Sequence, residues 1–517
     1  MMKNITKYIF SAFLVLTLLV SCDDGFDDLN TDKVRLVSID PTYQLNTAII
    51  QGAPDFNNNL PYQVSIVRQM ASPFTGFSTG ANLNQDNRAQ TRFLWAQGYL
   101  TTIKNLVDGI AAIEDDPEKT NLLSMLRIWR AHEFMILTDT YGDIPYLEGG
   151  KGFLEQISLP VYTPQEQIYD DLLSELESAS AALDPSKDAV EQELMYAGAG
   201  IDDNIQAWKR MGYSLLLRAA MRLVKVDAAK AQEFAAKAIA GGIMTSNADN
   251  AMVRHDASFR NGLGESLNGG VSGVFYLDKE FVDFLRDNDD PRLSTIAVRY
   301  VGSDSQGGQK PENADRDPSV QIGMPQGFDN TTIAPQVAED GLASLYDYSQ
   351  LDRTRLGSPE APTFYVTYSE TLLLYAEAIV KGWATGDANA VYQNAIRANM
   401  EQFSAWPGNT TIPESDINTY LSTHSLTPGM ELEQINNQYW VSSFLNGSES
   451  WANFRRSGFP NVAPNPYPGS ELKTEPFIRR LTYPDSERTV NAANLDQAIS
   501  RQGPDNLETR VWWDKKP

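Results

Sequence analysis

The residue with the most specific chemistry is Cys22, the single cysteine of the 517-residue chain. It follows Leu19-Val20-Ser21 at the end of an apolar run over residues 8–20, and Lys3 and Lys7 precede that run. A basic start, a short apolar stretch and small residues are typical of a secretory signal peptide, and the run is shorter than the roughly 20 residues that span a bilayer core. The pattern resembles a bacterial lipobox, in which the cysteine thiol is acylated and the chain is cut just before it. An ordinary signal peptide ahead of a free thiol is the alternative.

Acidic residues follow Cys22 at once, with four aspartates within residues 23–28. An acidic run after a lipidated cysteine resembles the surface-export signal of certain Gram-negative outer-membrane lipoproteins. Acyl chains such as palmitate hold a protein to a membrane at about 0.8 kcal/mol per buried CH₂. We therefore expect a signal peptide over 1–21, an acidic lipidated tether over 22–45, and a body over 46–517 that faces the cell exterior and is anchored to the outer membrane by lipid alone.

The charge balance limits the partners of this chain. It carries 67 acidic and 42 basic residues, a net charge of −25. Such a chain repels nucleic acid and anionic membrane surfaces, so neither is expected as a partner. With 42% hydrophobic and 10% aromatic residues, the body is expected to fold rather than remain disordered.

One segment matches a catalytic motif. Residues 76–80, Gly-Phe-Ser-Thr-Gly, fit the G-x-S-x-G elbow of serine hydrolases, which needs a buried strand before the serine and a helix directly after it. Pro73 would interrupt a central strand, and the polar residues 82–87 lack helical spacing. A glycine-rich surface loop explains the match, so we predict no catalytic residue here.

The sequence offers no clear metal or cofactor site. His132, His255 and His424 are the only histidines, and their spacing matches no zinc motif. The acidic residues 287–290 are followed by Pro291 where a calcium loop would continue, so a helix end and turn is the better interpretation. No glycine-rich nucleotide loop is present. Among so many acids a glycosidase pair of carboxylates remains an open alternative.

Aromatic side chains are the candidate ligand-binding chemistry, because sugar rings stack on them while polar neighbours bond the hydroxyls. Loop aromatics in polar surroundings are harder to explain as core than aromatics on periodic helices. We predict a ligand site on the loop-rich side among Phe74, Phe77, Tyr346 and Tyr348, with Trp95 as a further platform. For Trp95 the alternative is that it packs in the core together with Tyr99. Trp406, beside Pro407-Gly408, is another loop aromatic.

Apolar residues recur at helical spacing over much of the body. The spacing predicts helices over 92–114, 120–141, 204–226, 228–240, 363–382 and 387–403, a helix starting at Thr163-Pro164-Gln165-Glu166, and shorter ones over 417–421 and 431–445. Paired helices with small residues at their crossings indicate tetratricopeptide-like repeats over about 92–241 and 363–445, with an irregular α-helical domain as the alternative. Residues 242–362 are rich in glycine, proline and asparagine and are predicted to be loop-rich, without a helix over 300–345.

A set of short motifs runs in order along the chain. The motifs are residues 127–134 leading to Tyr-Gly-Asp-Ile-Pro-Tyr at 141–146, Thr163-Pro164 with Ile168-Tyr169, residues 288–293, residues 368–370 with 376–378, Trp451 with Arg455-Arg456, and Tyr483-Pro484, Glu487, Asn491 and Trp512-Trp513-Asp514. Together they resemble the SusD/RagB family of outer-membrane nutrient-binding lipoproteins. The last group resembles one branch of that family.

The resemblance implies a mostly α fold of tetratricopeptide-like helix pairs with a loop-rich, ligand-facing region packed against them. It also implies a protein that is not an enzyme, captures oligosaccharides or peptides, and passes them to a SusC-type TonB-dependent transporter. Gly142 and Pro145 would set a turn, and Glu370 and Glu377 would bond inside the protein. Members of the family do not share their ligand-contacting residues, so the resemblance assigns no such residue in this chain. A cell-surface glycoside hydrolase and a protein-interaction scaffold on the helix repeats remain the alternatives.

Overall fold

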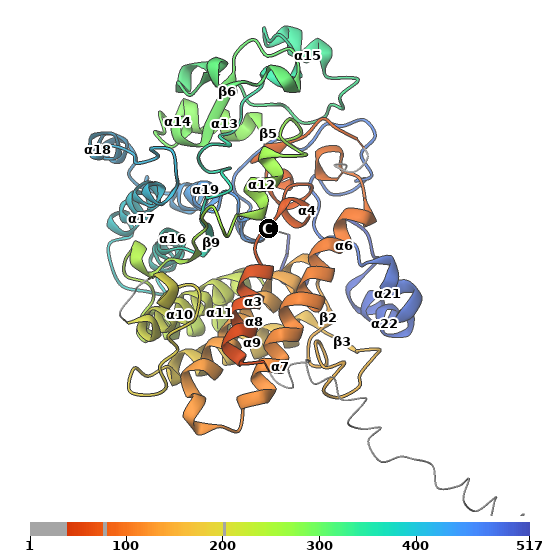
Figure 1. Ribbon diagram of the computed structural model, residues 1–517, viewed down its shortest axis with the longest axis vertical. Helices are drawn as coiled ribbons and strands as arrows, with labels where there is room; N and C mark the ends of the chain where they lie inside the picture. The colour runs from red at the N-terminus through yellow and green to blue at the C-terminus, as the bar shows by residue number, and fades with distance from the viewer. Residues whose placement is uncertain (1–38, 76–79, 200–202, 517) are drawn as a thin grey trace, which may run out of the picture. The chain divides into compact units, whose positions relative to one another are not determined.

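A computed structural model describes residues 39–75, 80–199 and 203–516 (Figure 1). Contacts divide the chain after Asp40, and Pro41–Pro517 is the unit described below. Cys22, the signal peptide and most of the tether lie outside the described residues, as does Phe77. In the described part of the chain, no helix has both the length and the apolar character needed to cross a membrane.

Apolar residues at helical spacing form the first helices. Their bounds are α3 (Pro41–Gln51), α4 (Phe56–Asn59), α5 (Gln63–Ile66), α6 (Arg88–Gln97), α7 (Lys104–Ile113) and α8 (Thr120–Tyr141). The helix predicted over 92–114 is in fact α6 and α7 joined by a π-helical segment, η3 (Gly98–Ile103). Gly142 ends α8 with a φ of +83°, a conformation that glycine adopts without strain, as the resemblance implies.

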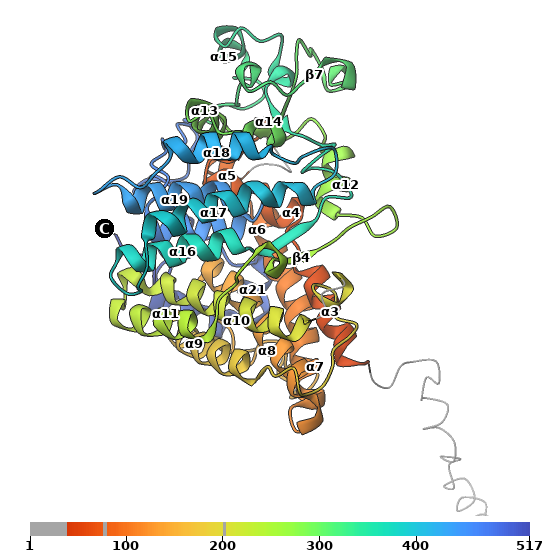
Figure 2. The same ribbon diagram turned by 90° about the vertical axis from the view of Figure 1, so that its left-hand side faces the viewer.

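The later helices pack in pairs and complete a stack. They are α9 (Gln165–Ala182), α10 (Asn204–Arg222), α11 (Ala228–Gly241), α16 (Tyr368–Val380), α17 (Ala388–Gln402), α18 (Glu414–Thr423), α19 (Glu431–Ser442), α20 (Gly447–Ser457), α21 (Asp485–Val490) and α22 (Ala492–Gln502). Helices α8–α11 lie below α16, α17 and α19 in both views (Figures 1 and 2). A Cβ on Gly212 would lie 2.2 Å from the Ser180 hydroxyl, so α9 and α10 approach closely only because a small residue stands there. The stack confirms the mostly α, tetratricopeptide-like fold.

Two predicted helix starts differ from the structure. The motif at 163–166 does mark the start of α9, which begins at Gln165, but Thr163 is not its N-cap: Thr163 lies in a strand, and the Asp143 carboxylate accepts the Gln165 N–H at 3.0 Å. Helix α16 begins at Tyr368, because Thr367 forms a reciprocal capping box with Glu370. The residues before it are extended and pair with another strand.

The strands are short and mostly join loops. The pairs are β1 (Met70–Ala71) with β5 (Tyr276–Leu277), β2 (Ile144–Pro145) with β3 (Tyr162–Thr163), and β4 (Ala251–Val253) with β9 (Thr363–Val366), while β6 (Ala297–Tyr300) lies between β7 (Ala314–Asp315) and β8 (Gln350–Leu351). All these pairings are antiparallel. The β4–β9 pair closes most of the loop-rich region, since it joins a strand near the start of that region to one directly after its end.

Short helices stabilise the loop-rich region, most of which lies at one end of the unit (Figures 1 and 2). They are α12 (Gly262–Asn268), α13 (Lys279–Asp287), α14 (Leu293–Ile296) and α15 (Ala334–Glu339). Helix α15 lies where no helix was predicted. Pro335 occupies its first turn and Val337 is buried, so tertiary burial stabilises a helix too short to show periodicity. The acidic run 287–290 is the end of α13 and a turn, with Asp289 at a φ of +52°.

A buried charge network joins four helices of the stack. Arg222 on α10 donates from Nε to Asp139 Oδ2 of α8 at 3.1 Å and also donates to Glu449 of α20. Arg218 Nε lies 3.3 Å from Glu449 Oε2, and Arg218 Nη2 lies 3.4 Å from Glu370 Oε2 of α16. Each of these side chains is at most 5% exposed. Their charges are therefore stabilised by one another and not by water.

Candidate functional site

Two of the predicted ligand residues meet at a second, smaller hydrophobic core, formed mostly by the loop-rich region. Tyr348 is a member of this satellite cluster, which consists of Ala71, Tyr276, Met324, Ile333, Val337, Leu342 and Tyr348, and Phe74 packs against it together with Ile322, Phe328 and Leu345. Tyr346 lies in the same loop as Leu345 and is half-buried. The rings of Phe74, Phe328 and Tyr346 are all partly exposed, so this cluster presents aromatic surface from three separate loops.

Within this cluster Tyr348 has a structural position. It is fully buried and donates its hydroxyl to Asp340 Oδ2 at 2.6 Å. Burial, reinforced by that hydrogen bond and the Asp340 charge, raises the pKa of the Tyr348 hydroxyl. A side chain held in this way supports the neighbouring rings and offers no free face to a ligand.

The Asp347 carboxylate fixes the loop that carries Tyr346. Its Oδ1 accepts the Arg299 Nε–H at 3.0 Å and the Gly302 N–H at 3.0 Å, and its Oδ2 accepts the Ala343 N–H at 3.1 Å. These contacts join three turns of the region. These hydrogen bonds hold the loop of Tyr346 in one conformation, which favours a preformed binding surface.

Trp95 lies in the main core and not in the satellite cluster. It is 7% exposed, and its ring centroid lies 4.9 Å from that of Tyr99, 5.2 Å from Tyr141 and 5.7 Å from Tyr483. Core packing, the alternative considered for this residue, accounts for its position. Trp95 is therefore not part of the candidate ligand surface.

The residues around the hydrolase-like motif do not have the geometry of an elbow. Ser78 itself lies outside the described residues. The strand β1 ends before Pro73, and the first regular element after the motif is a short 3₁₀ turn, Ala81–Leu83. A nucleophile elbow needs a strand leading straight into the serine and a helix leaving it.

The histidines are used inside the protein. His132 is buried and stacks on Trp129 with ring centroids 4.5 Å apart. His255 Nε2 lies 3.1 Å from Thr363 Oγ1, and His424 stacks on Tyr420. Among the described residues, no cluster of His, Cys, Asp and Glu has the arrangement of a metal site.

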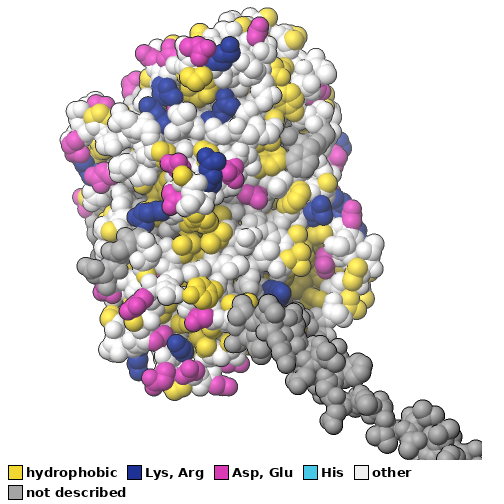
Figure 3. Space-filling model, viewed as in Figure 1, with side chains coloured by type: hydrophobic (Ala, Val, Ile, Leu, Met, Phe, Trp, Pro, Cys, Tyr) yellow, Lys and Arg dark blue, Asp and Glu magenta, His cyan; other side chains and the backbone are white. Residues whose placement is uncertain are grey.

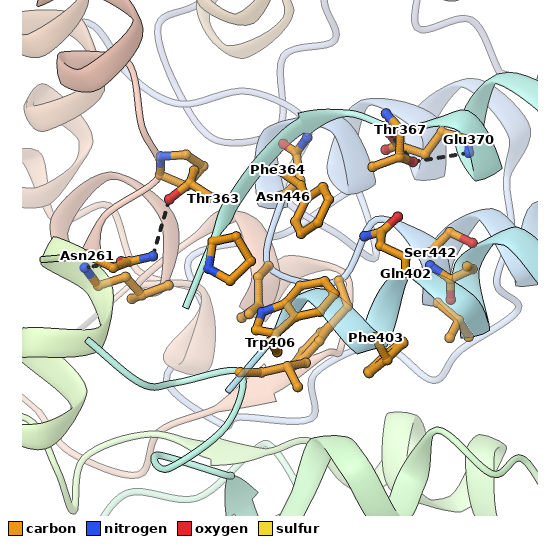
Figure 4. A pocket seen from close by; sticks show the side chains of 18 of the residues that line it. Asn261, Thr363, Phe364, Thr367, Glu370, Gln402, Phe403, Trp406, Ser442 and Asn446 are labelled. Atoms are coloured by element: carbon orange, nitrogen blue, oxygen red, sulfur yellow. Dashed lines mark hydrogen bonds between the residues drawn. The ribbon is translucent and has the colours of Figure 1, made fainter. Parts of the chain in front are cut away.

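A second aromatic-lined region is a pocket of about 60 Å³ between β9, α12, α16, α17 and α19. Phe364 and Trp406 stand side by side in it (Figure 4), with ring centroids 4.8 Å apart, and Phe403 lies 5.3 Å from Trp406. Amide and hydroxyl side chains complete the wall: Asn261, Thr363, Thr367, Asn399, Gln402, Ser442 and Asn446. The sequence marks Trp406 as a loop aromatic but gives no sign that Phe364, in an unrecognised strand, would stand beside it.

The comparisons with known proteins place this geometry in a family. A SusD-like family model, described as starch-binding and associating with the outer membrane, matches residues 33–484. The chain belongs to the SusD-like family. No curated protein matches it in sequence.

Solved structures share the SusD-like fold over nearly the whole chain. A chitin-binding protein superposes with a TM-score of 0.80 at 27% identity, covering 92% of this chain and 100% of that one. A Bacteroidetes AC2a SusD-like protein gives 0.79 at 25% identity, with the same coverage. A SusD homologue from Bacteroides uniformis gives 0.75 at 22% identity over 92% and 99% of the two chains.

The residues that carry the resemblance make structural contacts. Glu377 receives two bonds from Arg456, both at 2.8 Å, and Glu370 accepts the Thr367 N–H at 3.0 Å. Both glutamates therefore bond inside the protein, as the resemblance implies. Trp513 is buried and donates its Nε1–H to Asp139 at 2.8 Å.

Proposed function

We propose that this protein is a non-catalytic, surface-exposed lipoprotein that captures oligosaccharide and passes it to a SusC-type TonB-dependent transporter. The observation that carries the proposal is membership in a family described as starch-binding and outer-membrane-associated, supported by 27% identity to a chitin-binding protein over 92% of the chain. Peptide is the other ligand class that the resemblance allows.

The surface supports an uncharged ligand and a protein partner. Acidic side chains gather over the turn between α7 and α8 (Figure 3) and would repel polyanions. The connection between β2 and β3 exposes apolar side chains: Phe153 is 83% exposed, Leu147 53% and Leu159 50%. Exposed apolar side chains concentrated in one segment are typical of protein contacts, which supports docking on a transporter.

A ligand panel separates the three candidate functions. The purified mature protein is titrated with chito-oligosaccharides, malto-oligosaccharides and short peptides by calorimetry, and the mixtures are then assayed for new reducing ends. Binding without product supports the capture protein. New reducing ends would identify a glycoside hydrolase, and the absence of any ligand would leave a protein-interaction scaffold.

Phe74→Ala and Tyr346→Ala should each weaken glycan binding by about 1–3 kcal/mol, by analogy with base–aromatic stacking. Both rings are partly exposed on loops, with Phe74 against the satellite cluster and Tyr346 next to Leu345, so their loss should leave the melting temperature nearly unchanged. Phe234→Ala, which removes a half-buried ring on α11, is the matched control and should bind as the wild type does. Unchanged affinity in both loop variants would contradict this site, and a large fall in melting temperature would assign the rings to the core.

Cys22→Ala should release the protein from the membrane fraction or stall its processing. The lipobox pattern around Cys22 motivates this prediction, because acyl chains on that thiol would be the anchor. Cell fractionation and metabolic labelling with a fatty acid measure the result. A Cys22→Ala protein that still incorporates the fatty acid would overturn the assignment.

A further inference from the structure

A larger hollow adjoins the pocket of Figure 4. It measures about 260 Å³ and is lined by Met252, Arg254, His255, Glu360, Pro362 and Ala405. Pro362 lines both spaces, and Ala405 directly precedes Trp406. A contact of 3.1 Å between His255 Nε2 and Thr363 Oγ1 joins the two walls. The two spaces therefore belong to one region, and neither shares a lining residue with the satellite cluster.

The small pocket holds polar groups with unused bonding capacity. Gln402 accepts a bond from Asn250 on its amide oxygen, and Asn446 donates its amide N–H to the Tyr365 carbonyl at 3.1 Å. Within the described residues, the Gln402 amide nitrogen and the Asn446 amide oxygen have no partner. Glu370 Oε1, on a side chain that is 2% exposed, also has none. A buried polar atom without a partner is costly, so Glu370 Oε1 favours a polar occupant, while the two amide atoms are not fully buried and can bond such an occupant.

The size and walls of the pocket limit that occupant. About 60 Å³ is more than the roughly 10–15 Å³ that one water needs and less than the about 150 Å³ of a cavity that holds benzene. Leu263, Val441 and Phe444 form apolar parts of the wall. An acetamido group is of this size, and it combines a methyl group, a carbonyl acceptor and an N–H donor. These match the apolar wall, the Gln402 N–H and the Asn446 oxygen respectively.

The hollow has the character of a sugar subsite. Arg254 and Glu360 are exposed on its rim, and neither forms an ion pair with another described residue. Their charged groups remain available to hydroxyls, as donor and acceptor respectively. Trp406 beside the hollow is half-buried, which leaves part of an aromatic surface for the apolar face of a ring.

We propose that the pocket of Figure 4 and the adjoining hollow form a second glycan subsite, in which the sugar ring occupies the hollow and its acetamido substituent enters the pocket. The ligand class is an N-acetylated sugar. The carbohydrate class rests on the proposed function, whereas the selection for the acetamido group rests on this pocket alone.

The test uses two ligands that differ only in the group that the pocket would bind. Triacetylchitotriose and cellotriose share the β-1,4-linked backbone, but the first has acetamido groups where the second has hydroxyls. The wild type should bind triacetylchitotriose at least about tenfold more tightly than cellotriose. Ala405→Trp would fill the hollow from an exposed position, and Ser404→Trp places the same side chain on the neighbouring exposed residue, which does not line it. Only Ala405→Trp should abolish the preference.

The outcomes separate this inference from the proposed function. Equal affinity of the wild type for both ligands, or an unchanged preference in Ala405→Trp, would overturn the second subsite. If Phe74→Ala and Tyr346→Ala then lose binding, the proposed function stands without it. Failure of the wild type to bind any glycan would overturn both. Melting temperatures of the two tryptophan variants check that each remains folded.

Discussion

Replacing Arg222 with alanine is expected to lower the free energy of unfolding by about 3–5 kcal/mol. Its guanidinium is 1% exposed, donates to Asp139 and Glu449, and lies 5.9 Å from the centroid of the Trp513 ring. Without it, two buried carboxylates would lose a cationic partner. Leaving a buried charge uncompensated costs far more than an intact buried pair contributes.

Urea unfolding followed by circular dichroism measures the effect of Arg222→Ala. Arg397→Ala is the control, since Arg397 is 30% exposed and pairs with Glu414 at 2.7 Å on the surface. Exposed pairs contribute about 0–1 kcal/mol, so its unfolding curve should barely move. Equal losses in both variants would show that the network does not hold the helices together. A second change, Glu449→Gln, should recover part of the loss, because it removes one of the unpaired charges.

Glu370→Gln is expected to remove part of the pH dependence of the free energy of unfolding. Burial raises the pKa of Glu370 to about 7 from an ordinary 4.5, although the Arg218 charge opposes the shift. The folded state therefore favours the protonated carboxyl. This contribution is fully present below about pH 4.5 and is lost as the pH rises through about 7. The full loss is on the order of 3 kcal/mol.

Glutamine cannot ionise, yet it keeps an oxygen that can accept the Thr367 N–H. The stability of Glu370→Gln relative to the wild type should therefore increase between pH 5 and pH 8 in urea titrations. Glu377→Gln is the matched control, because the pKa of that buried carboxyl is shifted in the other direction. Burial opposes ionisation of Glu377, but Arg456 outweighs it and lowers the pKa of that carboxyl. The contribution of a lowered carboxyl pKa is lost only below about pH 4.5, so Glu377→Gln should destabilise by nearly the same amount at pH 8 and at pH 5. Parallel pH curves for Glu370→Gln and the wild type would contradict the raised pKa.

The helices of the stack were largely predictable from spacing. Apolar residues at helical intervals marked α8, α10 and α17 within a few residues of their observed bounds. The reason is local, because a helix closes its hydrogen bonds within its own turns and needs one apolar face. Gly142 and the acidic turn at 287–290 were equally readable, since each depends on a backbone preference of its own residues.

The positions of the aromatic rings depended on the tertiary structure. Trp95, within a predicted helix, packs on Tyr483, far away in the chain, whereas Phe74, in a loop, remains partly exposed. Phe364 stands beside Trp406 only because β9 pairs with β4. Helix α9 likewise takes its cap from Asp143. Spacing along the chain reveals which face of an element is apolar, but not which distant element covers it. The helices and the lipobox pattern were therefore legible in the residues, whereas burial of Trp95 and Tyr348 and the pocket around Trp406 follow from contacts that only the folded chain makes.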